Sequence, residues 1–256
     1  ALEGVTFRLA VGDLALVLGP TGSGKSTLLR LAAGLLVPAD GDVAVDGVAA
    51  NAAPRGRVGI VFQDPESQLF AETVLDDVAF GPTNLGRSRD AAREVARAAL
   101  DTVGLDPVLF GPRSPFALSG GEARRAALAG VLALEPRYLL LDEPTAGLDA
   151  RGRADVVAAV MHAREHAGVM VVTHEAEELL ALADSVLALS EGRMVFAGSA
   201  RDLINDPSRL ESTGIAVPGV LAVQLAARRA GSTLPHLTLD PEEAARAIMA
   251  AGGWGA

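Results

Sequence analysis

The segment from Gly19 to Thr27 combines glycines, hydroxyl side chains and a lysine at a spacing suited to holding phosphate. It follows an apolar run at residues 14–18 and opens a helical pattern that we expect to end near Leu35. Glycines let successive backbone N–H groups curl around phosphate oxygens, and a helix N-terminus adds the positive end of its dipole. We expect Lys25, the only lysine in the chain, to bridge β- and γ-phosphate oxygens, and Ser26 to ligate Mg²⁺. The predicted phosphate-binding residues are Gly19, Pro20, Thr21, Gly22, Ser23, Gly24, Lys25, Ser26 and Thr27.

Two adjacent carboxylates, Asp142 and Glu143, end a second apolar run at residues 138–141. A buried strand here would place both at the carboxyl edge of a sheet, beside the phosphate loop. We expect Asp142 to hold Mg²⁺ through water and Glu143 to act as general base on the attacking water. A strand that ends in acids also fits a solvated strand end, and the upstream phosphate loop favours the catalytic interpretation.

A second helix start with free backbone amides is predicted at Ser119, Gly120, Gly121 and Glu122, before a helical run to residue 134. A single ATP cannot touch both helix starts within one compact subunit. Two subunits packed head to tail would bring Ser119 and Gly121 of one onto the γ-phosphate held by the other, which requires a dimer. By itself, Ser-Gly-Gly also describes a flexible loop with a helix cap.

Short apolar runs alternate with longer helical patterns, which predicts an α/β fold around a mostly parallel, covered sheet. The expected strands are residues 14–18, 58–62, 138–141, 169–173 and 185–189. Between Gln63 and Pro136 only helical patterns appear, at residues 89–103 and 122–134, and these indicate a helical insertion. Glu191 and Gly192 predict a hairpin turn between residues 186–189 and 194–195.

The C-terminal part predicts a small helical unit, with helices at residues 220–229 and 241–251. Asp240 is expected as N-cap of the second helix, Pro241 at its first position and Glu243 at its third.

Composition excludes several classes of protein. Half of the 256 residues are hydrophobic, which supports a sizeable core. The net charge of −10 disfavours binding to nucleic acid, and the absence of cysteine excludes disulfides and thiolate metal sites. The longest uncharged run, residues 212–227, is too short to cross a membrane, and the N-terminus shows no signal peptide, so cytoplasm is expected.

Over about residues 1–204 the motifs stand in the order and spacing of ABC ATPases, and the chain resembles that family. The motifs are Gly19–Thr27, Gln63, 118–122, 139–143, 146–149 and His174. The resemblance implies a P-loop NTPase (RecA-like) core at residues 1–204, with a helical subdomain inserted at about 64–136 and an accessory helical segment at 205–256. It also implies ATP and Mg²⁺ as cofactors.

The resemblance assigns roles to residues that would be uninformative alone. It implies that Gln63 senses Mg²⁺ and the attacking water, that Asp149 contacts the other subunit of the dimer, and that His174 touches the γ-phosphate as a switch. Without the two phosphate motifs, Gln63 and His174 would be ordinary polar residues at strand ends. The three other histidines match no motif and are expected to be solvated, namely His162, His166 and His236.

The run from Phe62 to Phe70 is similar to energy-coupling-factor ATPases, which power bacterial uptake of vitamins and transition-metal ions, including cobalt and biotin. That similarity implies a short helix after Gln63 and a groove that receives a membrane coupling subunit. Leu69 and Phe70 suit such docking, although packing inside the helical subdomain would also explain them. The partners implied are a second ATPase, identical or related, the coupling subunit near Gln63–Phe70, and a separate membrane subunit that binds substrate. The chain would then lie at the cytoplasmic face of the cell membrane.

The sequence departs from the common ABC pattern at three places. Glu122 stands where many ABC ATPases carry glutamine, and Arg124 stands where many carry glutamine or lysine. We still expect the chain to hydrolyse ATP. The adenine-stacking aromatic normally lies just upstream of a segment like residues 1–4, so stacking stays unassigned. Phe7 alternates with apolar residues and is expected in the core.

Two other functions remain open from sequence. A soluble ABC ATPase acting on DNA or ribosomes would use the same motor, but usually carries a coiled coil, a second cassette or a basic linker. A P-loop kinase for small molecules would explain Gly19–Thr27 and would leave residues 118–122 without a purpose.

Overall fold

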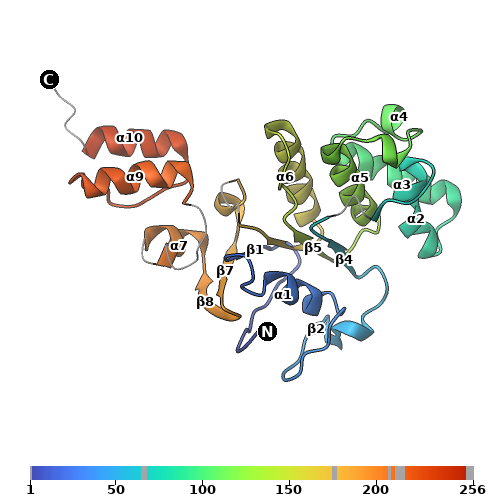
Figure 1. Ribbon diagram of the computed structural model, residues 1–256, viewed down its shortest axis with the longest axis horizontal. Helices are drawn as coiled ribbons and strands as arrows, with labels where there is room; N and C mark the ends of the chain where they lie inside the picture. The colour runs from blue at the N-terminus through green and yellow to red at the C-terminus, as the bar shows by residue number, and fades with distance from the viewer. Residues whose placement is uncertain (1, 65–67, 175–177, 207–208, 211–216, 252–256) are drawn as a thin grey trace. The chain divides into compact units, whose positions relative to one another are not determined.

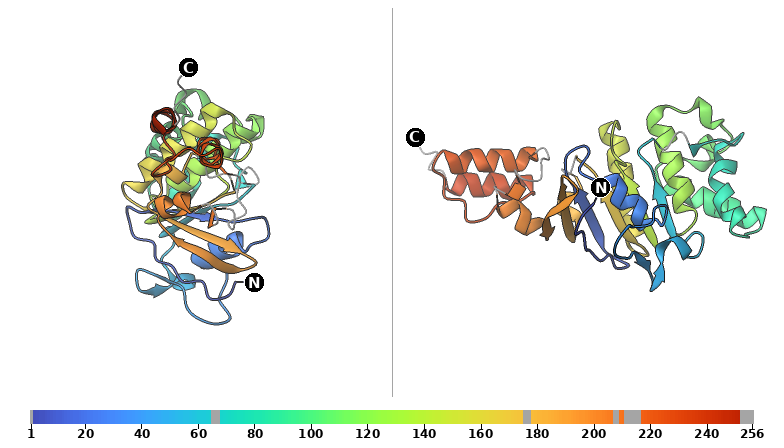
Figure 2. Two further views of the ribbon diagram at one scale, coloured as in Figure 1. Left: turned by 90° about the vertical axis from the view of Figure 1, so that its left-hand side faces the viewer. Right: turned by 60° about the horizontal axis from the view of Figure 1, so that its bottom comes forward.

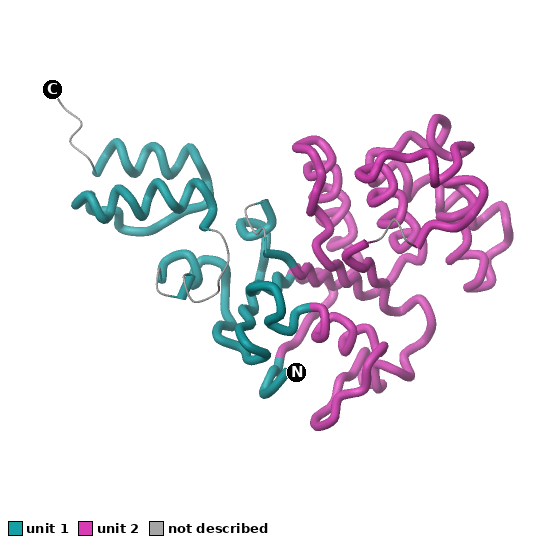
Figure 3. Tube along the Cα trace, viewed as in Figure 1, with its two compact units in different colours: residues 1–6, 15–25, 173–256 teal, residues 7–14, 26–172 magenta. Residues whose placement is uncertain are grey.

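The computed structural model describes residues 2–64, 68–174, 178–206, 209–210 and 217–251 (Figure 1). The chain divides into two compact units, one of residues 7–14 and 26–172, the other of residues 1–6, 15–25 and 173–256 (Figure 3). Below, the first is called the helical unit and the second the hairpin unit.

The helical unit contains three parallel strands in the order β4-β5-β6. Val61 of β4 lies opposite Leu141 of β5, so both strands end at the same edge. Nearly every residue of β5 and β6 is buried, as expected for a sheet covered on both faces. These strands span Val58–Val61, Tyr138–Asp142 and Gly168–Val172.

Four helices, α2 to α5, follow β4 and precede β5, where the sequence predicts a helical insertion (Figure 1). They span Val74–Asn84, Arg89–Thr102, Pro107–Phe110 and Gly120–Leu132, and α6 follows β5 at Ala150–Arg164. Capping side chains explain where several begin: Thr73 caps α2, Ser88 caps α3 and Asp149 caps α6. Helix α5 begins two residues before the predicted start because Ser119 is its cap.

Helix α1 (Lys25–Ala32) ends earlier than predicted, and the expectation of a helix to Leu35 is wrong. Gly34 adopts a φ of 72°, and Leu35 donates its N–H to the Arg30 carbonyl at 2.9 Å. This is the glycine-terminated Schellman geometry, which satisfies the last carbonyls and stops the helix. The unit also holds the short antiparallel pair β2 (Ala44–Val45) and β3 (Val48–Ala49).

In the hairpin unit, β1 (Leu14–Leu18) pairs in parallel with β7 (Ser185–Ser190), and β7 pairs antiparallel with β8 (Arg193–Gly198). The predicted hairpin is confirmed: Glu191 and Gly192 have φ values of 50° and 80°. Two successive positive φ angles match the type I′ turn that joins twisted strands. Every residue of β1 is buried. The expectation of a mostly parallel sheet is therefore confirmed, with β8 as an antiparallel addition.

The C-terminal residues of the hairpin unit form α7 (Ala200–Asn205), α9 (Gly219–Arg229) and α10 (Pro241–Ala251), with α9 packed along α10 (Figure 2). Gln224 is fully buried in α9, donates to the Thr238 carbonyl at 2.7 Å and accepts from its N–H at 3.0 Å. A buried side-chain amide needs hydrogen-bond partners, and Gln224 finds them in the backbone of Thr238. The two bonds hold the segment that leads into α10 against α9. The division of the chain at residue 204 stays a prediction.

The start of α10 is partly as predicted. Asp240 accepts from the N–H groups of Glu242 and Glu243 at 2.8 and 2.9 Å, as an N-cap should. The Glu243 carboxylate turns away from the helix start, accepts from the Thr238 hydroxyl at 2.8 Å and pairs with His236 at 3.1 Å. Both bonds lower the pKa of Glu243, the one from His236 most.

In the part of the chain that the structure describes, no helix is long and apolar enough to span a bilayer.

Candidate functional site

The phosphate loop between β1 and α1 folds around the ammonium group of Lys25. Lys25 is buried, and its Nζ donates to the carbonyls of Gly19 and Pro20 at 2.7 and 3.0 Å. The β7–β8 turn supports the loop from outside, since the Gly192 N–H donates to the Ser23 carbonyl at 3.1 Å. The positive charge is therefore held at the helix start, as the sequence predicts.

Glycine is required in this loop for two separate reasons. Gly24 has a φ of 103°, a region that other residues rarely adopt. A Cβ atom at Gly19 would lie 2.2 Å from the Leu189 carbonyl oxygen. Ser23 Oγ is buried and has no hydrogen-bond partner among the described residues. A cradle of glycine backbone, a buried cation and an unsatisfied hydroxyl fits a phosphate group.

The acids at the end of β5 are buried rather than solvated, and Glu143 has unusual backbone geometry. Glu143 has a φ of 51°, and its N–H donates to the Val172 carbonyl at 2.8 Å. A non-glycine residue in the left-handed region costs free energy and persists only where its surroundings hold it. The backbone of Glu143 is thus held in one orientation beyond the strand edge.

Gln63 and Glu143 are brought together by an arginine whose contacts the sequence did not predict. The Arg124 guanidinium donates to the carbonyl of Gln63 at 3.0 Å, to that of Glu143 at 3.4 Å, and to that of Ala146. Gln63 lies two residues beyond β4, and Glu143 lies one residue beyond β5. The only signal in the sequence was the departure from the family pattern at Arg124, which carried no hint of its partners.

The N-terminus of α5 and the loop before α6 together line a cavity of about 320 Å³. Ser119, Gly121, Glu122 and Asp149 all face it, so the structure unites residues that the sequence assigned to a shared nucleotide pocket. Ser119 and Glu122 form a reciprocal capping box, with Ser119 N to Glu122 Oε2 at 2.7 Å. The hydrogen bond from the Ser119 backbone lowers the pKa of Glu122, so its carboxylate stays ionised.

Two further predicted residues lie where strands end or helices begin. Asp149 accepts from the Gly152 N–H at 2.7 Å as the cap of α6. His174 is exposed and lies two residues beyond β6, directly after the buried Thr173. Ser26 and Thr27 occupy the first turn of α1.

In the segment after Gln63, the leucine Leu69 is buried and the adjacent aromatic residue Phe70 is exposed. Residues 65–67, where the resemblance implies a short helix, lie outside the described residues. Leu69 is only 8% exposed and packs inside the helical unit, so the expectation that it docks a partner is wrong. Phe70 is 57% exposed and meets Phe80 edge to face, with ring centroids 4.7 Å apart. Asp77 fixes this segment by accepting from the Phe70 N–H at 2.7 Å.

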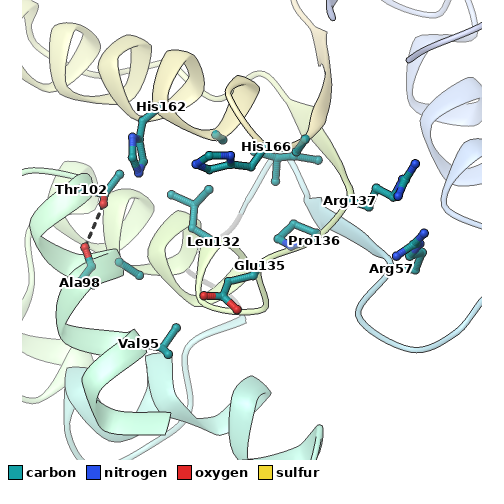
Figure 4. Close-up of a pocket in the computed structure, with 14 residues that line it drawn as sticks. Arg57, Val95, Ala98, Thr102, Leu132, Glu135, Pro136, Arg137, His162 and His166 are labelled. Atoms are coloured by element: carbon teal, nitrogen blue, oxygen red, sulfur yellow. Dashed lines mark hydrogen bonds between the residues drawn. The ribbon is translucent and has the colours of Figure 1, made fainter. Parts of the chain in front are cut away.

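A larger cavity of about 570 Å³ lies among α3, α6 and the connection from α5 to β5 (Figure 4). It contains none of the predicted site residues. His162 and His166 line it and are exposed, as predicted. Its charged side chains are paired within the chain: Arg57 and Arg137 with Asp46, and Glu135 with Arg87. Phe7, expected in the core, is only half-buried, because the N-terminal segment that carries it forms no strand.

Comparison with known proteins agrees with these motifs. A family profile described as "ABC transporter" matches residues 2–146. The energy-coupling factor transporter ATP-binding protein EcfA2 of Symbiobacterium thermophilum is 44% identical over 255 residues, which cover 97% of this chain and 88% of that protein. The protein of the same name from Caldanaerobacter subterraneus is 37% identical, with 97% and 90% covered.

Solved structures show the same fold. CbiO1 from Clostridium perfringens, described as part of the ABC transporter complex CbiONQ, matches with a TM-score of 0.73 and 30% identity, covering 88% of this chain and 92% of that one. The ATP-binding cassette MJ0796, solved as a dimer with ADP and Pi after hydrolysis, matches with a TM-score of 0.70 and 27% identity over 78% of this chain and 90% of its own.

The chain therefore belongs to the ABC transporter family, and its fold is that of the P-loop ATPases of this family. Within the family it is similar over nearly its whole length to the ATP-binding proteins of energy-coupling factor transporters.

Proposed function

We propose that this chain hydrolyses ATP between two protomers and drives uptake of a vitamin or a transition-metal ion through membrane partners. The observation that carries the proposal is the cavity shared by the α5 N-terminus and Asp149, where the lining arginine, Arg125, is already paired with Asp155 at 2.6 Å. The cation and the glycine cradle lie at a different helix start, so two copies of the chain supply complementary halves.

In each half-site the chain's own residues have distinct tasks. Lys25 and the amides of residues 19–27 bind the phosphates, and Ser23 donates its unpaired hydroxyl. Glu143 accepts a proton from the attacking water, while His174 and Gln63 orient that water and the γ-phosphate. Ser119, Gly120, Gly121 and Glu122 of the other protomer close the pocket, and all of these except Gly120 line the cavity together with Asp149.

Mg²⁺ fits the residues predicted to hold it. Ser26, Gln63 and Asp142 supply a hydroxyl, an amide and a carboxylate, and oxygen donors are what Mg²⁺ prefers. When bound, the ion neutralises charge that develops on the β- and γ-phosphates. Among the described residues no group of three or more His, Cys, Asp or Glu could hold a metal, which leaves this mixed set as the candidate.

The proposed membrane contact lies near Gln63–Phe70. The exposed Phe70 and Phe80 form an aromatic pair that suits an apolar helix from a coupling subunit. The chain then works at the cytoplasmic face of the membrane, and a separate membrane subunit selects the solute. The names of the relatives favour transport over action on DNA or ribosomes.

The substitution Glu143→Gln tests the proposal. It removes the base but keeps the volume and the backbone of Glu143, so ATP binding should persist while turnover falls by about 10²- to 10⁴-fold. Binding is measured with a fluorescent ATP analogue, and turnover by phosphate release. Glu94→Gln, in an exposed ion pair with Arg97 on α3, is the matched control and should leave turnover unchanged. Full turnover by Glu143→Gln would refute the proposal.

A further inference from the structure

Arg124 joins three segments of the helical unit that belong to the proposed catalytic machinery. It lies in α5, one turn after the Ser119 cap, and is half-buried. Its guanidinium donates to the carbonyls of Gln63, Glu143 and Ala146. Gln63 lies in the loop after β4, and Ala146 lies in the loop that leads to Asp149.

Only a guanidinium suits this arrangement. Arginine presents five N–H donors in one rigid plane, whereas lysine is a point donor on a flexible stem and glutamine has two short donors. The bonds to Glu143 and Ala146 come from the same nitrogen, Nη1, and the bond to Gln63 comes from the other, Nη2. One planar group therefore fixes the spacing between the loop after β4 and the loop after β5.

Glu143 is held on both sides of its backbone. Its N–H is bound to Val172 of β6 and its carbonyl to Arg124, so the two peptide groups that flank its left-handed backbone are both anchored. A strained backbone conformation is kept only where such anchors determine it. The direction of the carboxylate follows from the direction of the backbone that carries it.

We propose that Arg124 is a positioning residue that holds Glu143 and Gln63 in their working geometry and ties both to the helix whose N-terminus meets the partner's nucleotide. The inference rests on the proposed role of Glu143 as general base. Helix α5 then contacts the nucleotide bound by the partner and, through Arg124, holds the loops of Gln63 and Glu143 in its own protomer.

The test compares Arg124→Met, which keeps length and removes every donor, with Arg124→Lys, which restores a cation. A misplaced base lowers kcat by about 10- to 100-fold, because small displacements of reacting groups cost that much. The affinity for ATP should stay at the wild-type value, since the hydrogen bonds of Arg124 go to Gln63, Glu143 and Ala146 and not to the phosphate loop. Arg124→Lys should recover part of kcat.

The matched control is Arg164→Gln, which removes another arginine that bonds a distant loop carbonyl, Gly12 at 2.8 Å. It should lower the melting temperature and leave kcat unchanged. If Arg124→Met behaves like this control, or loses ATP affinity and kcat together, Arg124 is only structural and the inference is overturned.

A double-mutant cycle separates this inference from the proposed function. If Arg124 acts through Glu143, adding Arg124→Met to Glu143→Gln should cause almost no further loss of turnover. Multiplied losses in the double variant would overturn the positioning of Glu143 by Arg124. Wild-type turnover by Glu143→Gln alone would instead refute the proposed function.

Discussion

The two helix N-termini predicted to face phosphate are built in opposite ways. At α1 the loop has glycines with positive φ, a buried lysine and an unsatisfied hydroxyl at Ser23. At α5 the first turn is closed by the capping box of Ser119 and Glu122, and its nearest charge is the Glu122 carboxylate. The first end carries a lysine whose ammonium donates to loop carbonyls, whereas the arginine that lines the second, Arg125, is paired with Asp155 at 2.6 Å.

This difference is what the proposed pocket between two protomers would require of its two halves. In the proposed function, the α1 end binds phosphate strongly because it combines a lysine with the free amides of a helix start. In the same proposal, the α5 end offers the amides of Gly120 and Gly121 and the Ser119 hydroxyl, while Arg125 is occupied by Asp155, so this end binds phosphate only weakly until a partner surface completes it. The proposal therefore assigns the affinity for ATP to α1 and the requirement for a partner to α5.

The largest expected effect comes from removing the cation at α1. Lys25→Ala leaves the Gly19 and Pro20 carbonyls without their donor and removes charge-assisted bonds to phosphate. Turnover should fall by about 10²- to 10³-fold, the usual cost of losing a donor to transition-state charge. ATP affinity should fall too, measured by calorimetry, with Arg97→Ala on α3 as the control. If Lys25→Ala kept the wild-type affinity for ATP, the α1 end would not be the main phosphate-binding end and the contrast with α5 would be wrong.

A substitution at α5 should separate binding from turnover. Gly121→Asp places a carboxylate in the cavity beside Asp149, where it would repel a phosphate, yet an acid in the first turn of a helix is favourable for folding. ATP binding by the protomer should be unchanged, and turnover should fall about 100-fold. Gly130→Ala, in the same helix with open space at its Cβ, is the control. Weakened ATP binding by Gly121→Asp would contradict this account.

The smallest effect concerns the capping box. The hydrogen bond from the Ser119 N–H lowers the pKa of Glu122 below its ordinary value of 4.5. The ionised carboxylate therefore stabilises the folded chain fully above about pH 4.5. This stabilisation is lost as the pH falls through the lower folded pKa. Glu122→Gln should lower the melting temperature by about 1–4 °C at pH 7, and the difference should shrink below about pH 4. A difference that does not change with pH would exclude the carboxylate charge as its source.

Strands and phosphate-binding motifs could be predicted from sequence because local patterns determine them. The buried runs of β1, β5 and β6 and the glycines around Lys25 act through their own residues and immediate neighbours. The start of α5 was misplaced by two residues, although Ser119 and Glu122 carry the capping-box spacing.

Long-range contacts could not be predicted in this way. The bridge from Arg124 to Gln63 and Glu143 joins residues 61 and 19 positions apart, and nothing in the local sequence specifies it. Leu69 and Phe70 are adjacent and both apolar, yet one is buried and the other exposed. Which one faces inward depends on Asp77 and on the packing of α2.

Mixing two inactive variants tests the shared pocket most directly. A dimer of one Lys25→Ala copy and one Gly121→Asp copy has one pocket with both defects and one pocket with none. An equal mixture should therefore regain about a quarter of wild-type ATPase activity when copies pair at random. If the mixture stays as inactive as the separate variants, although the copies exchange, each nucleotide is handled within one protomer and the account is contradicted.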